Sequence, residues 1–478
     1  MIVVGGGSAG CVMAARLSED PSRSVLLLEA GPDYGPFADG RWPPEILDAG
    51  QMPFGSHDWG FEATEADRAR ILGGCSSHNE CVVVWSAPGD HARWAKIADE
   101  AWGFDAQLPF IRRAEDTIGA AEQPPEMLAA IDPIVRACVA AGYPELDACN
   151  GPVWGDGVAS IPRNVRDGVR WNAAFAYLDP ARDRPNLTIL DEALVDRVEL
   201  QGGRAAAVHG ARGGDPFRIE AGDVVVSAGA YASPAILQRS GIGPTDLLRG
   251  LGIEVAAPLE GVGRNLRDHL GVSVSWAGPA GEPPARDGFL YVMLRTSSSF
   301  AMDDDWDVHV IWAEGPLEED PSRPGLWAFA FALDATSVGT VQAVSADPSV
   351  LPTITQPWTD PSDHDLAVVA EAVDVVRRVA SRPQLASMID HELQPGPGTT
   401  VPDWIRATVG GYFHPVGTCA MGSVADPAAV VDARGRVHGV EGLRVVDASI
   451  FPTIPRANTH IATLAAAEFL AATMREDA

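Results

Sequence analysis

The first ten residues constrain the fold more than any other segment of the chain. A short apolar run, Ile2–Val4, turns at once into Gly5-Gly6-Gly7-Ser8-Ala9-Gly10, and a predicted helix follows over about residues 11–18. A second apolar run then ends at Glu29. Apolar strands on either side of a helix are typical of a βαβ unit in a parallel sheet that is covered on both faces. We therefore predict an α/β, Rossmann-type domain that begins at the N-terminus.

The glycines of this loop have the G-x-G-x-x-G spacing of dinucleotide-binding proteins. Gly5 would permit the tight turn, Gly7 would let the backbone approach the pyrophosphate, and Gly10 would allow close packing of helix on strand. Glu29 ends the second strand about 20 residues later, where a carboxylate can accept hydrogen bonds from a ribose. The predicted phosphate-binding residues at the turn and the helix N-terminus are Gly5, Gly7, Ser8, Ala9 and Gly10. The spacing alone does not distinguish NAD from FAD.

Charge and composition exclude several classes of function. The net charge of −30 disfavours nucleic acids and anionic membrane surfaces as partners, because a polyanion would repel them. Lys96 is the only lysine, which leaves one unpromising candidate for pyridoxal-phosphate chemistry. The six cysteines show neither paired metal-ligand spacing nor a dense disulfide framework, so we predict no metal site. With no signal segment and no long apolar run, a cytoplasmic protein is expected.

At 478 residues the chain is long enough for two domains. Alternating apolar residues between about 271 and 351 predict four strands of an antiparallel sheet. Residues 202 and 203, both glycine, predict a hairpin turn between two further strands. A long amphipathic helix is predicted at about 363–379, and a last strand at 442–447 precedes a closing helix from about 461.

Several later motifs resemble one family in the correct order. They are Gly229-Ala230-Tyr231-Ala232-Ser233-Pro234 and its continuation to Gly243, the run from Gly261 to Arg267-Asp268-His269, His414-Pro415-Val416-Gly417-Thr418, and Leu443-Arg444-Val445-Val446-Asp447-Ala448-Ser449. Together they resemble the glucose-methanol-choline (GMC) oxidoreductases, which are FAD-dependent alcohol oxidases and dehydrogenases. The resemblance implies a Rossmann-type FAD-binding domain with an inserted α+β substrate domain built on an antiparallel sheet.

The resemblance also implies how the chain is divided. The expected segments are residues 1–150 as the first part of the FAD-binding domain, 151–184 as a segment of the substrate domain, 185–270 as the second FAD-binding part, 271–413 as the substrate-binding domain, and 414–478 as the C-terminal FAD-binding part with the catalytic histidine and asparagine.

One motif resembles the choline oxidase branch of this family in particular. The chain reads Gly73-Gly74-Cys75-Ser76-Ser77-His78-Asn79-Glu80-Cys81 where that branch has Cys-Ser-Ser-His-Asn. The resemblance implies that Gly73, Gly74, Ser77 and Asn79 surround the flavin and that His78 carries it covalently. The alternative is that His78 only packs against the flavin. Glu80 stands where the branch usually has serine, and it either points away or contacts the substrate.

Alcohol oxidation requires a base for the hydroxyl proton, and histidine has a suitable pKa. By resemblance that base is His414, and Asn458 binds the alcohol oxygen and contacts the flavin. The resemblance also assigns flavin contacts to Val195, Asp447, Ala448 and His460. Among the other histidines, His269 is interpreted as structural, and whether His309 faces the pocket is left open.

The substrate is predicted less specifically than the chemistry. Around Pro284–Phe289 the paired tryptophans expected for a choline cage are missing, and Arg286 would repel a cation, although Asp287 could supply a carboxylate. We therefore expect an uncharged primary alcohol or a natural-product hydroxyl as the substrate, with O2 as the acceptor. A dehydrogenase that reduces a quinone or protein carrier, a hydroxynitrile lyase and a flavin-binding protein without turnover stay open as alternatives, as does a homodimer.

Overall fold

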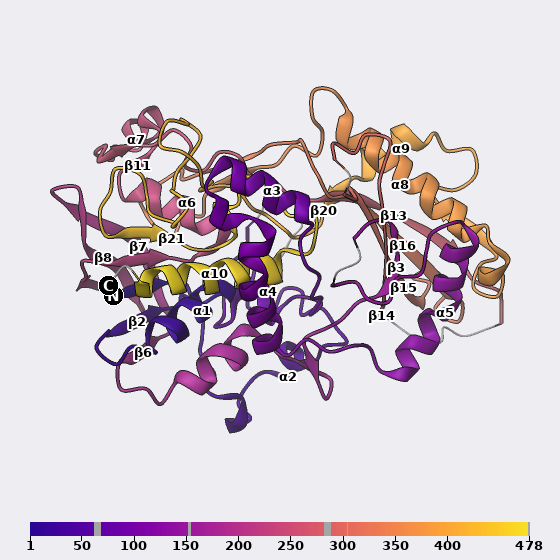
Figure 1. Cartoon of the computed structure of the whole chain (residues 1–478), viewed down its shortest axis with the longest axis horizontal. Helices are drawn as coiled ribbons and strands as arrows, with labels where there is room; N and C mark the ends of the chain where they lie inside the picture. The colour runs from indigo at the N-terminus through magenta and orange to yellow at the C-terminus, as the bar shows by residue number, and fades with distance from the viewer. Residues whose placement is uncertain (62–67, 152–153, 282–287, 304, 477–478) are drawn as a thin grey trace.

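The computed structural model describes residues 1–61, 68–151, 154–281, 288–303 and 305–476. Two sheets follow one another along the longest axis of the molecule (Figure 1). A parallel sheet occupies the end where both termini lie side by side, and an antiparallel sheet occupies the other end (Figure 1). This arrangement confirms the predicted fold class.

The parallel sheet is the dinucleotide-type core predicted from the first residues. Its strand order is β21 (Leu443–Val445), β10 (Val224–Val226), β1 (Ile2–Val4), β2 (Val25–Leu28) and β6 (Leu187–Leu190), and all neighbours run parallel. Helix α1 (Ser8–Leu17) packs against α10 (Thr459–Glu476), which in turn packs against α4 (Phe104–Ile118). The central strands β10 and β1 are fully buried, and α1 packs against β1 and β2, whereas the edge strand β6 is partly exposed. The closing helix begins at Thr459, slightly before the predicted position.

A three-stranded antiparallel sheet adjoins this core. It consists of β7 (Ala193–Gln201), β8 (Arg204–Arg212) and β9 (Asp215–Glu220). The turn between the first two strands has Gly202 at φ 61° and Gly203 at φ 81°. Two consecutive residues with positive φ are what a tight hairpin turn requires, so the predicted hairpin is confirmed. Helix α6 (Gly229–Arg239) packs against β7.

The large antiparallel sheet has the four predicted strands at its centre. In order across the sheet the strands are β19 (His391–Gln394), β13 (Leu270–Ala277), β16 (Pro324–Ala332), β15 (Val308–Pro316), β14 (Gly288–Thr296) and β3 (Gly157–Ser160), with β20 (Gly410–Gly411) paired to the start of β13. Helix α8 (His364–Ala380) matches the predicted amphipathic helix.

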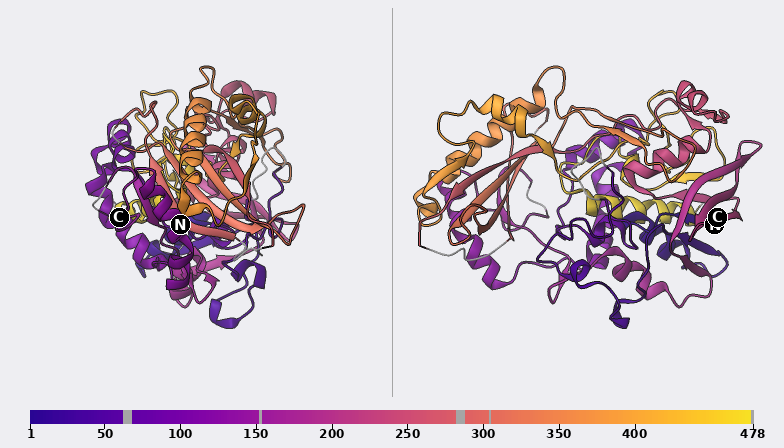
Figure 2. Two further views of the ribbon diagram at one scale, coloured as in Figure 1. Left: turned by 90° about the vertical axis from the view of Figure 1, so that its right-hand side faces the viewer. Right: turned by 180° about the vertical axis from the view of Figure 1, so that it is seen from behind.

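The two faces of this sheet have different partners. Alternate residues of β14, such as Leu290 and Val292, pack in one core with α8 and α5 (Pro125–Ala140). Figure 2 shows α8 on the outer side of the sheet, away from the parallel-sheet core. Phe289 and Tyr291 point to the opposite face, where they line the main cavity. The period of two along the strand therefore separates the core face from the cavity face.

The packing places two segments differently from the predicted division. Helix α5 lies within the expected first part (1–150), yet its Ile131 and Ile134 belong to the core of the antiparallel sheet. The helical turn at Ala174–Leu178 lies within the expected substrate segment (151–184), yet it packs against α1 and α4. The chain therefore crosses between the two cores more often than the predicted boundaries imply.

The other α-helices and strands complete the fold. They are α2 (Pro44–Leu47), α3 (Pro88–Ile97), α7 (Thr245–Gly250), α9 (Val401–Thr408), β4 (Val165–Arg166), β5 (Val169–Arg170), β11 (Ile242–Gly243), β12 (Ala257–Pro258), β17 (Thr340–Gln342) and β18 (Thr353–Thr355). Among the residues that the structure describes, none of the helices combines the length and the apolar character that crossing a membrane requires.

Candidate active site

One cavity of about 600 Å³ brings the distant sequence motifs together. Its walls come from the loop after β1, the segment at 74–80, the start of β7, the N-terminal part of α6, strand β14 and the segments around residues 412–415, 447–448 and 458–463. Of the residues predicted for the site, those that line it are Gly5, Gly7, Ser8, Ala9, Glu29, Gly74, His78, Asn79, Val195, His414, Asp447, Ala448, Asn458 and His460.

The first glycine loop is built by close backbone contacts. Gly5 has φ +94°, and a Cβ on Gly10 would lie only 1.8 Å from the carbonyl oxygen of Gly5. Gly10 therefore packs the helix onto the turn and does not line the cavity itself. A Cβ on Gly7 would meet nothing closer than Cα of Gly74 at 3.8 Å. The space beside Gly7 is thus open to the cavity, as a cradle for a pyrophosphate requires.

Alanine at positions 7 and 10 should have separable effects. We expect Gly7→Ala to keep the fold but to weaken binding of FAD by at least about tenfold, or about 1.4 kcal/mol, because the methyl group occupies the phosphate cradle. Gly10→Ala should instead lower the thermal midpoint of unfolding, because its methyl group collides with backbone. Titration of the apoprotein with FAD in a His78→Asn background, in which binding stays reversible, together with thermal melts of both variants, measures the two effects. Unchanged FAD affinity in Gly7→Ala would contradict the assignment.

Glu29 is held in place by the backbone on both sides. Its Oε2 accepts a hydrogen bond from the N–H of Gly6 at 2.7 Å, and its Oε1 accepts one from the N–H of Gly31 at 2.7 Å. Burial raises the pKa of Glu29 to about 7, against the lowering effect of these hydrogen bonds. Each carboxylate oxygen keeps acceptor capacity for a second donor, such as a ribose hydroxyl.

The second glycine loop positions the segment that carries His78. Gly73 (φ +91°) and Gly74 (φ +54°) both adopt backbone conformations that favour glycine. Ser77 Oγ donates to the carbonyl oxygen of Leu72 at 3.1 Å, so Gly73 and Ser77 shape the loop and do not line the cavity. His78 and its neighbour Asn79 follow directly and line it.

The predicted catalytic pair meets at the cavity wall. Nδ2 of Asn458 lies 3.3 Å from Nε2 of His414, although 44 residues separate them in the chain. Burial, then the neighbouring His269 and His309, and then Arg68 hold the pKa of His414 well below its usual value. His414 is therefore neutral at physiological pH and able to accept a proton. A single alcohol oxygen can reach both side chains, because they already touch each other.

Tyr412 was not identified from the sequence, and it lies between two of the histidines. Its hydroxyl group is 3.1 Å from Nε2 of His309 and 3.4 Å from Nδ2 of Asn458. Tyr412 lines the cavity, whereas His309 contacts its hydroxyl group from the sheet side. The position of Tyr412, two residues before His414, was the only signal for it in the sequence. His309 therefore does not line the cavity itself, because Tyr412 lies between them.

Glu80 points into the cavity and not away from it. Tyr291 donates a hydrogen bond from its hydroxyl group to Oε2 of Glu80 at 2.9 Å. The guanidinium group of Arg163 lies 4.0 Å from the same oxygen and stacks on the ring of Tyr291 with 3.6 Å to its centre. Burial raises the pKa of Glu80, whereas Tyr291 and Arg163 oppose that rise. An acidic side chain thus faces the substrate space with its charge countered by a neighbour.

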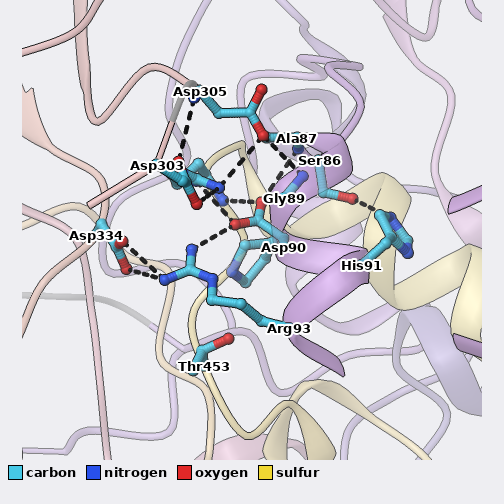
Figure 3. Close-up of polar contacts among 12 residues, drawn as sticks. Ser86, Ala87, Gly89, Asp90, His91, Arg93, Asp303, Asp305, Asp334 and Thr453 are labelled. Atoms are coloured by element: carbon cyan, nitrogen blue, oxygen red, sulfur yellow. Dashed lines mark hydrogen bonds and ion pairs between the residues drawn. The ribbon is translucent and has the colours of Figure 1, made fainter. Parts of the chain in front are cut away.

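A buried ion-pair network anchors the segment that carries Asn458. Arg456 is 1% exposed, and its Nε donates to Oδ1 of Asp90 at 2.9 Å. Its other guanidinium nitrogens bond Asp303 and Asp305, which lie between β14 and β15, with 3.0 Å between Nη2 and Oδ2 of Asp303. Figure 3 shows these three carboxylates in one cluster, which Arg93 extends by bonding Asp90 and Asp334. Helix α3, which carries Asp90, and the two aspartates that precede β15 are therefore both tied to the residue two positions before Asn458.

The cavity also holds polar atoms that suit a bound flavin dinucleotide. Ser227 Oγ, Asn458 Oδ1 and both ring nitrogens of His460 are buried without a hydrogen-bond partner among the described residues. All three side chains line the cavity, next to the glycine loop. Burial lowers the pKa of His460 to about 4, so its ring is neutral and offers one donor and one acceptor. Unpartnered buried polar atoms beside an open phosphate cradle fit FAD.

Comparison with protein-family models gives one family for most of the chain. Residues 1–271 match the N-terminal model and residues 335–467 match the C-terminal model described as GMC oxidoreductase. An oxygen-dependent choline dehydrogenase of Chromohalobacter salexigens is 32% identical over 99% of this chain and 94% of its own length. Its counterpart in Xanthomonas campestris pv. campestris is 34% identical over 98% of this chain and 94% of its own length.

Solved structures show the same architecture. The crystal structure of pyridoxine 4-oxidase from Mesorbium loti superposes with a TM-score of 0.86 at 30% identity and covers 99% of each chain. A formate oxidase superposes with a TM-score of 0.86 at 22% identity, covering 100% of this chain and 98% of that one, a likeness that concerns the fold alone.

Proposed function

The chain belongs to the GMC oxidoreductase family, and on this premise we propose that it oxidises a primary alcohol to an aldehyde with O2 as the electron acceptor. GMC oxidoreductases bind FAD and act on alcohol groups. The observation that carries the proposal is the contact of His414 Nε2 with Asn458 Nδ2, at 3.3 Å on the wall of the cavity beside the glycine loop. The names of the relatives, for the oxidation of choline and of pyridoxine, support an alcohol substrate.

The chemistry of the two side chains is complementary. The alcohol oxygen accepts a hydrogen bond from Nδ2 of Asn458 while its own proton points to Nε2 of His414. Bound FAD would supply the acceptor for the hydride that leaves the carbinol carbon. His414 takes the hydroxyl proton as a general base, and its burial keeps it in the neutral form that this step needs.

The proposal is tested with a panel of alcohols under anaerobic conditions. Bleaching of the flavin absorbance by a primary alcohol is the expected result, and hydrogen peroxide release in air then separates an oxidase from a dehydrogenase that needs a quinone or carrier. A flavin that no alcohol in the panel bleaches, together with cleavage of a cyanohydrin, would favour the hydroxynitrile lyase alternative.

We expect an uncharged alcohol to be preferred over choline. The substrate side of the cavity is lined by apolar and aromatic residues, among them Phe289, Tyr291, Ile311 and Phe329. Among the described residues of this side, the acidic wall residue Glu80 is countered by Arg163, so we expect a quaternary cation to find little net attraction there. Residues 284–287, where the sequence lacks the paired tryptophans of a choline cage, lie outside the described residues.

Glu80→Gln distinguishes the two kinds of substrate. With benzyl alcohol, the rate of flavin bleaching should change by less than about tenfold, or about 1.4 kcal/mol, because glutamine can still accept the hydrogen bond of Tyr291. With choline, any activity of the wild type should fall further, because a negative charge on the described wall of the substrate space is removed. Choline as the better wild-type substrate, with a selective loss in Glu80→Gln, would overturn the preference for uncharged alcohols.

We also propose that His78 carries the flavin covalently. His78 lines the cavity that contains Gly7 and Asn458, and its motif resembles that of the choline oxidase branch. Acid precipitation of the wild type should give a yellow pellet, whereas His78→Asn should give a colourless pellet and a yellow supernatant. The His78→Asn holoenzyme provides the control that FAD still binds before precipitation. A colourless wild-type pellet would show that the histidine only packs against the flavin.

A further inference from the structure

His269, interpreted from the sequence as structural, touches the proposed base directly. Its Nδ1 lies 2.9 Å from Nδ1 of His414, and its Nε2 lies 2.9 Å from the carbonyl oxygen of Pro455. The two rings meet at 86° with 5.1 Å between their centres. The pairing of β20 with the start of β13 sets up this contact, because the N–H of Tyr412 bonds the carbonyl oxygen of His269 at 2.9 Å.

These contacts determine which nitrogen of each ring carries a hydrogen. A carbonyl oxygen only accepts hydrogen bonds, so Nε2 of His269 carries the hydrogen that is donated to Pro455. Burial lowers the pKa of His269 to about 4, so the ring is neutral and its Nδ1 is an acceptor. Nδ1 of His414 must then be the donor. Neutral His414 therefore keeps its lone pair on Nε2.

The lone pair faces the place where the chemistry is proposed. Nε2 of His414 is the atom in contact with Nδ2 of Asn458 at the cavity wall. The opposite tautomer would direct an N–H at the alcohol and would place two lone pairs against each other at the His269 contact. On the basis of the proposed function, we propose that His269 is a positioning residue that holds His414 with its hydrogen on Nδ1 and its lone pair on Nε2, ready to take the alcohol proton.

The groups around the pair are compatible with this role. Asp268 Oδ1 accepts a hydrogen bond from the backbone N–H of His414 at 2.9 Å. This bond involves the backbone of His414 and not its imidazole ring. Arg68 donates to the carbonyl oxygen of Phe413 at 3.1 Å, and its positive charge disfavours a protonated resting His414. His309 bonds the hydroxyl group of Tyr412 through its Nε2. When Nε2 gains the alcohol proton, the N–H at Nδ1 stays bonded to His269, so the orienting contact persists through the step.

Two substitutions of His269 separate its two contacts. Asparagine can place an acceptor oxygen near the position of Nδ1, facing His414, whereas glutamine can place a donor near the position of Nε2, facing Pro455. We expect His269→Gln to slow anaerobic flavin reduction by at least about tenfold, by analogy with enzymes in which the base adopts the wrong tautomer. His269→Asn should retain a rate closer to that of the wild type.

The tautomer itself is read by nitrogen NMR of the holoenzyme labelled with ¹⁵N-histidine, with His414→Gln used to assign the signals. The wild type should show the hydrogen of His414 on Nδ1, and His269→Gln should show a mixture of tautomers or the Nε2–H form. A wild-type hydrogen on Nε2 would overturn the proposal even if neither variant folds. Equal rates and unchanged tautomers in both variants would also overturn it. Failure of the proposed function would give a different result. If His414 were not the base, His414→Gln would still reduce the flavin at the wild-type rate.

Discussion

Replacing His414 by glutamine should slow the reduction of the bound flavin by an alcohol about 10²- to 10⁴-fold, the range expected when a general base is removed. Glutamine keeps a polar group of similar reach, so hydrogen bonding to Asn458 can persist while the ability to hold a proton is lost. The measurement is single-turnover bleaching under anaerobic conditions. The oxidised flavin spectrum and the thermal midpoint should stay close to those of the wild type, which controls for misfolding.

The pH dependence of the same rate gives a second readout with a defined sign. His414 works only when it is neutral, and burial together with His269, His309 and Arg68 lowers its pKa well below the usual 6.5. The wild-type rate should therefore stay level as the pH falls to about 6.5 and should decline only below it, as the imidazole becomes protonated. The decline should be absent in His414→Gln. A wild-type rate that falls already between about pH 8 and pH 7 would contradict a base with a lowered pKa.

Replacing Arg456 by methionine should lower the free energy of unfolding by about 3–5 kcal/mol, as is typical when one partner of a buried ion pair is removed. Asp90, whose side chain is 0% exposed, would lose the Nε contact and would keep Arg93 as its one cationic partner among the described residues. Asp303 and Asp305 would lose their contacts with the segment that carries Asn458. Flavin reduction should therefore also slow, because Asn458 is no longer held against His414.

Denaturant unfolding of Arg456→Met measures the loss, and the double variant with Asp90→Asn is the matched control. The double variant should recover part of the stability, because it no longer leaves a buried carboxylate short of a partner. A loss of only about 1 kcal/mol or less in Arg456→Met would mean that the network behaves like an exposed ion pair.

Local patterns explain why the fold was predictable. The turn at Gly5–Gly10, the hairpin at Gly202–Gly203 and the alternation along β14 each depend on residues within about ten positions of one another. Backbone conformation and strand period are set over such distances, so the sequence reveals them directly. The assignment of α5 to the antiparallel sheet was not predictable in the same way. Its amphipathic face fits any apolar surface, and only the tertiary packing selects β14 and β3.

The same distinction between local patterns and tertiary packing applies to the candidate site. By itself the sequence determined that a dinucleotide loop, a His78 segment and the pair His414 and Asn458 exist, because each belongs to a motif with fixed neighbours. Only the tertiary structure decided that Tyr412 lies beside Asn458, that Glu80 faces the cavity and that His269 orients His414. His269 and His414 are 145 residues apart, and their contact arises because β20 pairs with the start of β13. A side-chain contact of that kind depends on strand register between distant segments, which no local pattern encodes.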